Sequence, residues 1–380
     1  MGVIIGDSTD TPAAAAPKQR DAVFDVAKGL AILVVLGHHS SSNVARLYTA
    51  PHSISWWGLN FLNRILSFSV PAFLVISAIL SARTLIKRPA VLPFYGRRLP
   101  AILWPYLVWT AVYWLAYMVA APSSAAPRVG RVFGYELTGP AYLMHFKDRL
   151  RDVIWGKAYF HMYFMVVLFE LIILLPLAVA YVRWRKPGFW EIMATALVIQ
   201  GAIMVAQHYT RLMPYPGSNA LWYIGSLLPG AWIGANWEEF RAKQRQYVWP
   251  LVGICVVTLI LFLREELKVI HRIEADNYLS NGSLTIYASC ISILLLTFSE
   301  SITKRVRWCK VLEPLGRTSL QIYLIHPGVM EVMERHAIAG ALLKTHLGVI
   351  LAPMIMFSVT IGIIALMRVT RIEKAFFGRS

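Results

Sequence analysis

The stretch DVAKGLAILVVLGHHSSS, residues 25–42, is the segment that best indicates the fold of this chain. It is an apolar run close to the length of about 20 residues that a helix needs to cross a bilayer. Lys28 lies near one end of the run, and His38 and His39 lie near the other. Ionisable side chains in a membrane are costly unless they face protein or a wet cavity. The segment therefore predicts a membrane helix with a chemical role beyond anchoring.

The composition supports a membrane protein along the whole chain. Of 380 residues, 57% are hydrophobic and 15% are charged, and the mean hydropathy is +0.55. A soluble domain cannot expose so much apolar surface. We attribute the net charge of +17 to loops that set membrane topology, and we expect no nucleic-acid partner. Cys255, Cys290 and Cys309 form no spaced framework, so neither disulfides nor a metal site is indicated.

About ten apolar runs are long enough to span a bilayer, so the predicted fold class is all-α, a polytopic membrane protein with about ten transmembrane helices. The expected helices cover residues 26–44, 57–82, 99–120, 158–182, 189–209, 219–237, 247–263, 283–300, 313–335 and 347–368. We expect a disordered tail at 1–20, one ten-helix membrane domain at 21–372 and a cytoplasmic tail at 373–380.

Lysine and arginine gather in alternate loops. The basic loops on one side comprise residues 83–98, 183–186, 241–245, 304–310 and 368–379, and Lys18 and Arg20 join them. The loop around 264–276 on the other side balances its basic residues with acidic ones. This positive-inside pattern predicts that both termini are cytoplasmic. In the long loop 121–157, the amphipathic stretch FKDRLRDVIW predicts a short interfacial helix.

The first helix carries a polar stripe. Lys28 and His39 are eleven residues apart, which is three turns plus about 20°, and their separation along the axis is about 16 Å. Asp25 lies about 60° and Ser42 about 40° from Lys28, while His38 points about 80° away. We expect this stripe to face a shared wet passage. Two simpler readings stay open: Lys28 as an anchor at the headgroups, and His39 as a packed polar group.

Two later runs add polar candidates. In SLQIYLIHP, Ser319, Tyr323 and His326 fall within about 40° of one another on a helix, which fits a substrate cavity or a packed polar seam. In the fourth run, His161 is expected at the outer interface. Glu170 is either a buried structural partner or a site residue.

Arg97 and Arg98 open the third helix. They fit a topology signal, and arginine is also suited to planar contacts with the phosphates of a ligand. The sequence has no P-loop, no GxSxG elbow and no HExxH motif. What remains is an enzyme that handles a substrate across the bilayer, or a transporter.

The stretch RDAVFDVAKGLAILVVLGHH resembles the start of the acyltransferase-3 family of integral membrane acyltransferases, most closely its fucose 4-O-acetylase-like and intercellular-adhesin-like branch. The first helix of that family carries a basic residue, ten residues and then histidine. Lys28 and His39 fit this spacing, whereas His38 fits only with a one-residue deletion.

Further segments are similar to the family in the same order. FSVPAFLVISAIL resembles its second helix, with Ala78 in place of the usual glycine. FYGRRLPAILWPY resembles a segment with paired basic residues and Pro-Tyr, although Ala101 stands where a further arginine is usual, so no role of that arginine is carried over. FHMYFMVVLFELIILLPL and SLQIYLIHP resemble two later helices. The resemblance covers nearly the whole chain from about residue 20, without the soluble hydrolase-like domain of some members.

The resemblance implies an O-acyltransferase of the bacterial cytoplasmic (inner) membrane. It would move an acyl group, most often acetyl, from cytoplasmic acyl-CoA to a hydroxyl of a carbohydrate or lipid-linked sugar, with acyl-CoA as donor and no permanently bound cofactor. Membrane lipids are the other expected partner. A glycan or small-molecule transporter or exporter, and an inactive scaffold, are the alternatives. Acceptor, acyl chain and oligomeric state stay open.

The expected roles follow from this chemistry. His39 would be the general base, in direct transfer or through an acyl-histidine relay. Lys28 would stabilise anionic charge on the donor or on the oxyanion. Arg97 and Arg98 would hold CoA phosphates. The substrate cavity would be lined by Asp25, Glu170, Ser319, Tyr323 and His326.

Overall fold

The structure is a computed structural model that describes residues 22–120, 129–132, 135–137, 146–335 and 348–378, so the predicted tail at 1–20 lies outside the described residues. The described chain is helical apart from one antiparallel hairpin, which confirms the predicted all-α class. Its elements are α1 (Ala22–Tyr48), α2 (Ile54–Ile65), η1 (Leu66–Phe68), α3 (Ser69–Lys87), α4 (Val91–Ala120), β1 (Val129–Val132), β2 (Tyr135–Leu137), α6 (Phe146–Trp155), α7 (Tyr163–Arg185), α8 (Phe189–Thr210), η2 (Pro216–Ser218), η3 (Ala220–Tyr223), α9 (Ile224–Ala235), α10 (Trp237–Ile270), α11 (Asn277–Thr303), α12 (Val306–Arg317), α13 (Ser319–Arg335), α15 (Gly348–Val369) and α16 (Glu373–Phe377).

Eight stretches of the described chain are long and apolar enough to cross a membrane. The predicted runs 219–237 and 313–335 are also helical, but their helices are shorter: α9 has 12 residues and α13 has 17. These two helices are therefore shorter than the eight candidate spans. Both contribute side chains to the cavity described below.

Two predicted runs are interrupted. Run 57–82 forms α2, the single turn η1 and α3. Pro71 has no backbone N–H, so in a continuous helix the carbonyl group one turn earlier would have no partner. This accounts for the break at η1. Run 313–335 is divided at Thr318, whose Oγ donates to the carbonyl of Pro314 over 2.9 Å. Both breaks lie next to α1, which contacts the helices on either side of each break.

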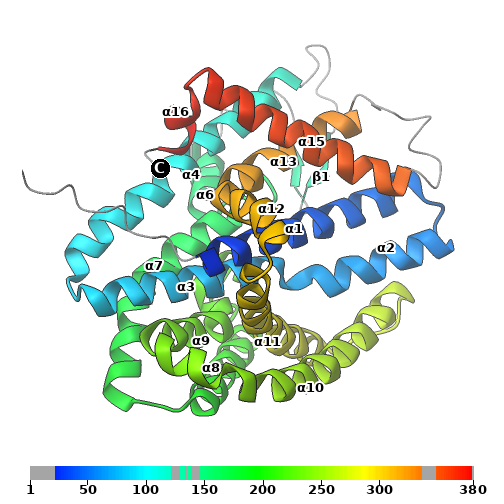
Figure 1. The fold of residues 1–380 in the computed structure, drawn as a ribbon. Coiled ribbons are helices and arrows are strands. Elements are labelled where there is room, and N and C mark those ends of the chain that lie inside the picture. Colours follow the sequence, from blue (N-terminus) through cyan, green and yellow to red (C-terminus); the bar gives the residue numbers. More distant parts are fainter. Residues whose placement is uncertain (1–21, 121–128, 133–134, 138–145, 336–347, 379–380) are drawn as a thin grey trace, which may run out of the picture.

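The first helix is the centre of the bundle. It packs against α2, α3, α11, α12, α13 and α15. In Figure 1, α1 runs through the middle of the molecule, with α15 above it and α10 and α11 below. The N-terminal half of α1 meets α12, whose Gly316 lies against the Asp25 backbone. The C-terminal half carries His38, which contacts Asn63 of α2.

A close helix crossing joins α9 to α3. Gly230 and Gly234 are spaced as in a GxxxG motif and face Ala78, Ile79 and Ala82. A Cβ on Gly234 would overlap the Ile79 carbonyl oxygen and lie 2.7 Å from the Ala82 Cβ. Small residues of this kind let helix backbones approach closely inside a membrane, where packing rather than the hydrophobic effect holds helices together.

Two segments outside the long helices are ordered. The stretch FKDRLRDVIW is helical as predicted and forms α6. Residues 373–377, expected as a tail, form α16, and the Trp104 indole N–H donates to the Ala375 carbonyl over 2.9 Å. The C-terminal end is thereby attached to α4.

The α9–α3 crossing gives a direct stability prediction. Gly234→Ala should lower the free energy of unfolding by roughly 1–3 kcal/mol, because the new methyl group overpacks the crossing. Gly253→Ala in α10 is the matched control, since a Cβ there meets nothing within 4 Å. Thermal unfolding in detergent or nanodiscs measures both. Equal stability of the two variants would contradict the crossing.

Candidate functional site

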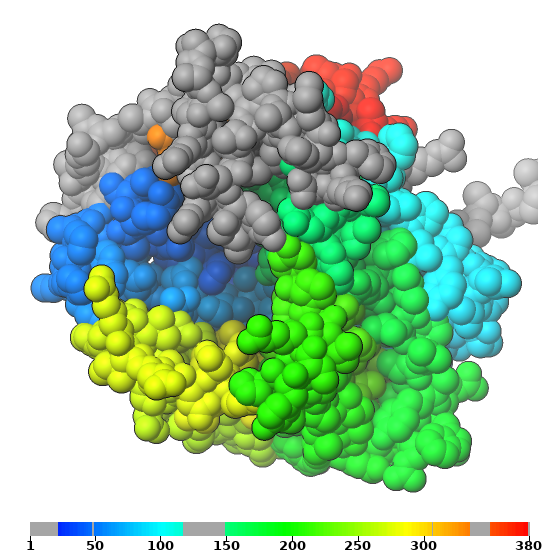
Figure 2. Space-filling view, turned by 180° about the vertical axis from the view of Figure 1, so that it is seen from behind, coloured from blue at the N-terminus to red at the C-terminus, as the bar shows by residue number. Residues whose placement is uncertain are grey.

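A cavity of about 320 Å³ lies where α1 ends and where α7 and α11 begin. This volume falls in the range of roughly 300–1,000 Å³ that is usual for small-molecule sites. Figure 2 shows a hollow on this face between the blue segments of α1 and α2, the yellow segments near 270–290 and green segments. The polar side chains around the cavity include those of His38, His39, Arg64, Tyr163, Asn281 and Tyr323. The sequence-predicted residues His39 and Tyr323 therefore contact a common cavity.

Imidazole rings cluster beside this cavity. The His39 ring centroid lies 5.2 Å from that of His38 and 5.4 Å from that of His326. The His161 centroid lies 6.2 Å from that of His326. Among the described residues, no group of three or more His, Cys, Asp or Glu side chains could hold a metal ion. The cluster thus offers proton acceptors and donors to whatever occupies the cavity.

The prediction that His161 lies at the outer interface is wrong. Its side chain is buried, with 1% of its surface exposed, and neither ring nitrogen has a hydrogen-bond partner among the described residues. The turn before α7 folds inward, and the Tyr323 hydroxyl donates to the His161 carbonyl over 2.5 Å. The ring packs edge-on against Tyr113. Tertiary packing of the connection, rather than its place next to an apolar run, buries this side chain.

Hydrogen bonds orient two of the rings. His38 Nδ1 lies 2.9 Å from the Asn63 carbonyl oxygen, and His326 Nδ1 lies 2.9 Å from the Ile322 carbonyl oxygen. A ring nitrogen at that distance from a carbonyl is assigned the proton, which leaves Nε2 as the acceptor. For His326 this acceptor is buried and has no partner in the described part of the chain. A bare imidazole nitrogen next to His39 can take up a proton.

Lys28 and Asp25, which we expected to share a cavity with His39, pair with each other. Lys28 Nζ lies 2.6 Å from Asp25 Oδ1, and Arg317 Nε of α12 lies 3.5 Å from Asp25 Oδ2. The lining described above includes neither Lys28 nor Asp25. Helix α12 crosses α1 at Gly29, between Lys28 and His39, and its backbone fills the space beside that glycine. Gly29 lies about 100° around the helix from Lys28, so α12 packs beside the polar stripe, and its Arg317 pairs with Asp25.

Three other predicted cavity residues do not line the cavity. Glu170 Oε2 accepts from the backbone N–H of Ala220 over 2.7 Å, so it caps η3 as a structural partner. Ser319 is buried at the start of α13, and His326 lies behind His39 rather than at the cavity surface. Of the SLQIYLIHP candidates, Tyr323 alone belongs to the described lining.

The paired arginines lie elsewhere in the bundle. Arg97 is exposed near the start of α4, and Arg98 is partly buried, with Nη2 donating to Thr84 Oγ1 over 3.5 Å. Neither residue lines the cavity beside His39. The structure thus separates the imidazole cluster from the arginine pair, and the phosphate-binding role of the pair stays a prediction.

Arg64 is a cavity residue that the sequence patterns above do not single out. It lies inside the predicted run 57–82, where an ionisable side chain is itself a signal of function. In the structure, Arg64 lies in the last turn of α2 and contacts the cavity, and its Nε lies 2.9 Å from Glu266 Oε2 of α10. The sequence shows the charge of Arg64, and the fold shows that Glu266 is its partner.

Comparison with known proteins places the chain in a family. The family model described as an acyltransferase domain, of acyltransferase-3 type, matches residues 21–369, which is nearly the whole chain. The match identifies the family and no branch within it. No curated protein and no solved structure matches the chain.

The structural role of Glu170 can be tested by paired variants. Glu170→Leu should lower the free energy of unfolding by roughly 1–3 kcal/mol, because the buried Ala220 N–H loses its acceptor. Glu170→Gln keeps an oxygen at that position and should lose much less. Thermal unfolding of the purified variants measures the difference. Equal losses for Gln and Leu would show that the carboxylate charge, and not the hydrogen bond, is what the site requires.

Proposed function

The chain belongs to the acyltransferase-3 family and is a membrane acyltransferase, and on this premise we propose that it moves an acyl group, foremost acetyl, from acyl-CoA to a hydroxyl of a carbohydrate or glycolipid acceptor. The observation that carries the proposal is the contact of His39 with a cavity rich in hydroxyl, amide and imidazole groups. Such a lining suits a polyhydroxylated ligand, whose many donors and acceptors all need partners.

We assign His39 as the general base. A sugar hydroxyl is a weak nucleophile at neutral pH, and removal of its proton during attack on the thioester carbonyl typically accelerates such a reaction 10²–10⁴-fold. The hydroxyl oxygen forms the new ester bond, the carbon–sulfur bond breaks, and CoA leaves as the thiol after taking up a proton. In an acyl-histidine relay, His39 would first carry the acyl group itself.

His39 is preferred over His38 for two reasons. His39 fits the family spacing from Lys28, and its ring lies 5.4 Å from that of His326, whose bare Nε2 can share the abstracted proton. His38 is held by Asn63 instead, through its Nδ1 and through its carbonyl oxygen, which accepts from Asn63 Nδ2 over 2.7 Å. His38 therefore fixes the α1–α2 contact at the cavity wall.

The donor side of the proposal uses the basic end of the bundle. The positive-inside pattern assigns the loops with Arg97 and Arg98 to the cytoplasm, where acyl-CoA is available. There the two guanidinium groups would hold CoA phosphates. Lys28 has a different role in this proposal: it pairs with Asp25 on the same helix, and Asp25 also meets Arg317 of α12.

His39→Ala should reduce acyl transfer by roughly 10²–10⁴-fold while thermal stability stays close to that of the parent protein. His38→Ala should retain much of the transfer and lose some stability, because its bond to Asn63 is removed. The assay follows labelled acetyl from acetyl-CoA to carbohydrate with purified protein in nanodiscs. The reverse pair of phenotypes would assign the base to His38.

Arg98→Ala should raise the apparent KM for acyl-CoA several-fold and leave kcat nearly unchanged, because it removes binding that substrate and transition state share. CoA alone should stabilise the parent protein against heat, since a ligand that binds the folded state raises its stability. Arg183→Ala, in another basic loop, is the control. A protein that CoA does not stabilise would favour a transporter over an acyl-CoA-dependent enzyme.

A further inference from the structure

The charge of the cavity points to the chemistry of its ligand. We propose that the acceptor carries a negatively charged group, a carboxylate or a phosphate, and that Arg64 binds this group in the cavity beside His39. The inference rests on the proposed function, because it treats this cavity as the acceptor site. It adds a substrate class and a specificity residue that the family match does not provide.

The described cavity lining holds one guanidinium group and no carboxylate, and Glu266 pairs with that guanidinium from outside the lining. Among the described residues that line the cavity, Arg64 is the one with a permanent charge, and none is aspartate or glutamate. The other polar lining groups are hydroxyls, an amide and imidazoles. Charges in a poorly solvated cavity interact far more strongly than they do in water. A ligand with a negative group would therefore gain more from this lining than a neutral sugar would.

Arg64 still has donors to offer. Its Nε side faces Glu266 Oε2 at 2.9 Å, and Glu266 is not part of the cavity lining. A guanidinium carries five N–H donors in a planar fork. Among the described residues, no acceptor is bonded to the two terminal nitrogens of Arg64, whose side chain is 35% exposed. Those nitrogens can form a bidentate pair with a carboxylate or phosphate.

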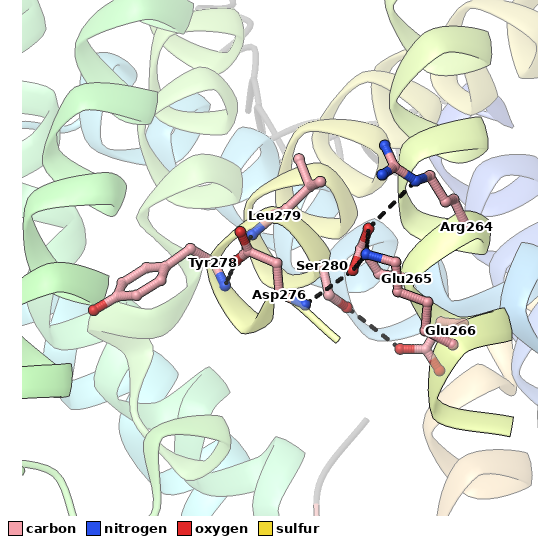
Figure 3. A network of polar contacts seen from close by, with 8 residues as sticks. Arg264, Glu265, Glu266, Asp276, Tyr278, Leu279 and Ser280 are labelled. Atoms are coloured by element: carbon pink, nitrogen blue, oxygen red, sulfur yellow. Dashed lines mark hydrogen bonds and ion pairs between the residues drawn. The ribbon is translucent and has the colours of Figure 1, made fainter. Parts of the chain in front are cut away.

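Hydrogen bonds outside the cavity hold the partner of Arg64 in position. Glu265 is fully buried and accepts from the backbone N–H of Asp276 over 2.9 Å, and the neighbouring Glu266 accepts from Ser280 Oγ over 3.3 Å. Figure 3 shows this network joining the end of α10 to the start of α11. It holds Glu266 in place, and Glu266 in turn aligns the guanidinium. A side chain that is aligned before binding loses less entropy when the ligand arrives.

Arg64 and His39 contact the same cavity of about 320 Å³, so one ligand can meet both side chains. A sugar acid or sugar phosphate would place its anion at Arg64 and a hydroxyl at His39. The phosphates of CoA have the same chemistry, so an experiment must separate the two sources. We assign the cavity to the acceptor because neither Arg97 nor Arg98, which we propose to hold CoA, belongs to its described lining.

The test compares methyl β-D-glucuronide with methyl β-D-glucoside, which differ in the carboxylate at C6. The parent protein should be stabilised against heat more by the glucuronide and should acylate it with the higher kcat/KM. Arg64→Gln should lower the glucuronide-to-glucoside ratio of kcat/KM at least tenfold, about 1.4 kcal/mol. Arg64→Lys should keep part of the ratio, because it keeps the charge and loses the planar fork.

Arg211→Gln is the matched control. Arg211 is exposed where α8 ends and does not line the cavity. This variant should leave the sugar preference unchanged. In a separate arm, stabilisation by CoA alone should be the same in the parent protein and in Arg64→Gln. A loss of CoA stabilisation without a change in sugar preference would assign Arg64 to the donor and overturn the proposal.

The outcomes separate this inference from the proposed function. Equal stabilisation of the parent protein by both sugars overturns the inference, whatever the enzyme activity and whether or not Arg64→Gln folds. Selective, Arg64-dependent stabilisation by the glucuronide without any acyl transfer would support anion recognition and contradict the proposed reaction.

Discussion

A polar ring inside an apolar helix bundle must bond to protein or meet water, and this constraint governs the centre of the structure. Both ring nitrogens of His161 and Nε2 of His326 are buried without a partner among the described residues, and His39 lies against His326 at the edge of a cavity. Burial without partners is costly for groups that hydrogen-bond strongly in water. The cluster therefore makes sense as a place where a bound ligand supplies the missing partners and where protons are exchanged.

The two halves of α1 have different surroundings, and this difference creates the site. At Gly29 the α12 backbone packs directly on α1 and leaves no room for a cavity. Further along, the segment around the break at η1 brings Arg64, Ser67 and Ser69 to the cavity wall. Ion pairing thus fixes one end of α1, while the other end is left open for ligand.

Much of the fold could be predicted from the sequence, because apolar runs and basic loops are local signals. His39 and Tyr323 could be predicted at the cavity because each lies on the polar face of an apolar helix. A helix face does not reveal which neighbour packs on it, so the contact of Arg317 of α12 with Asp25 was not predictable. The Glu170 bond to Ala220 joins residues 50 positions apart and needs the tertiary fold. Arg64 lies within an apolar run and His161 lies next to one, and ionisable groups at such positions indicate function.

The central claim is that the acceptor hydroxyl meets His39 in the cavity between α1, α7 and α11. An electron cryomicroscopy structure with a bound acceptor sugar and a non-reactive acyl-CoA analogue tests it most directly. The account predicts sugar density in this cavity, with a hydroxyl within about 3.2 Å of a His39 ring nitrogen. Sugar density elsewhere, with the His39 ring sealed from both ligands, would contradict it.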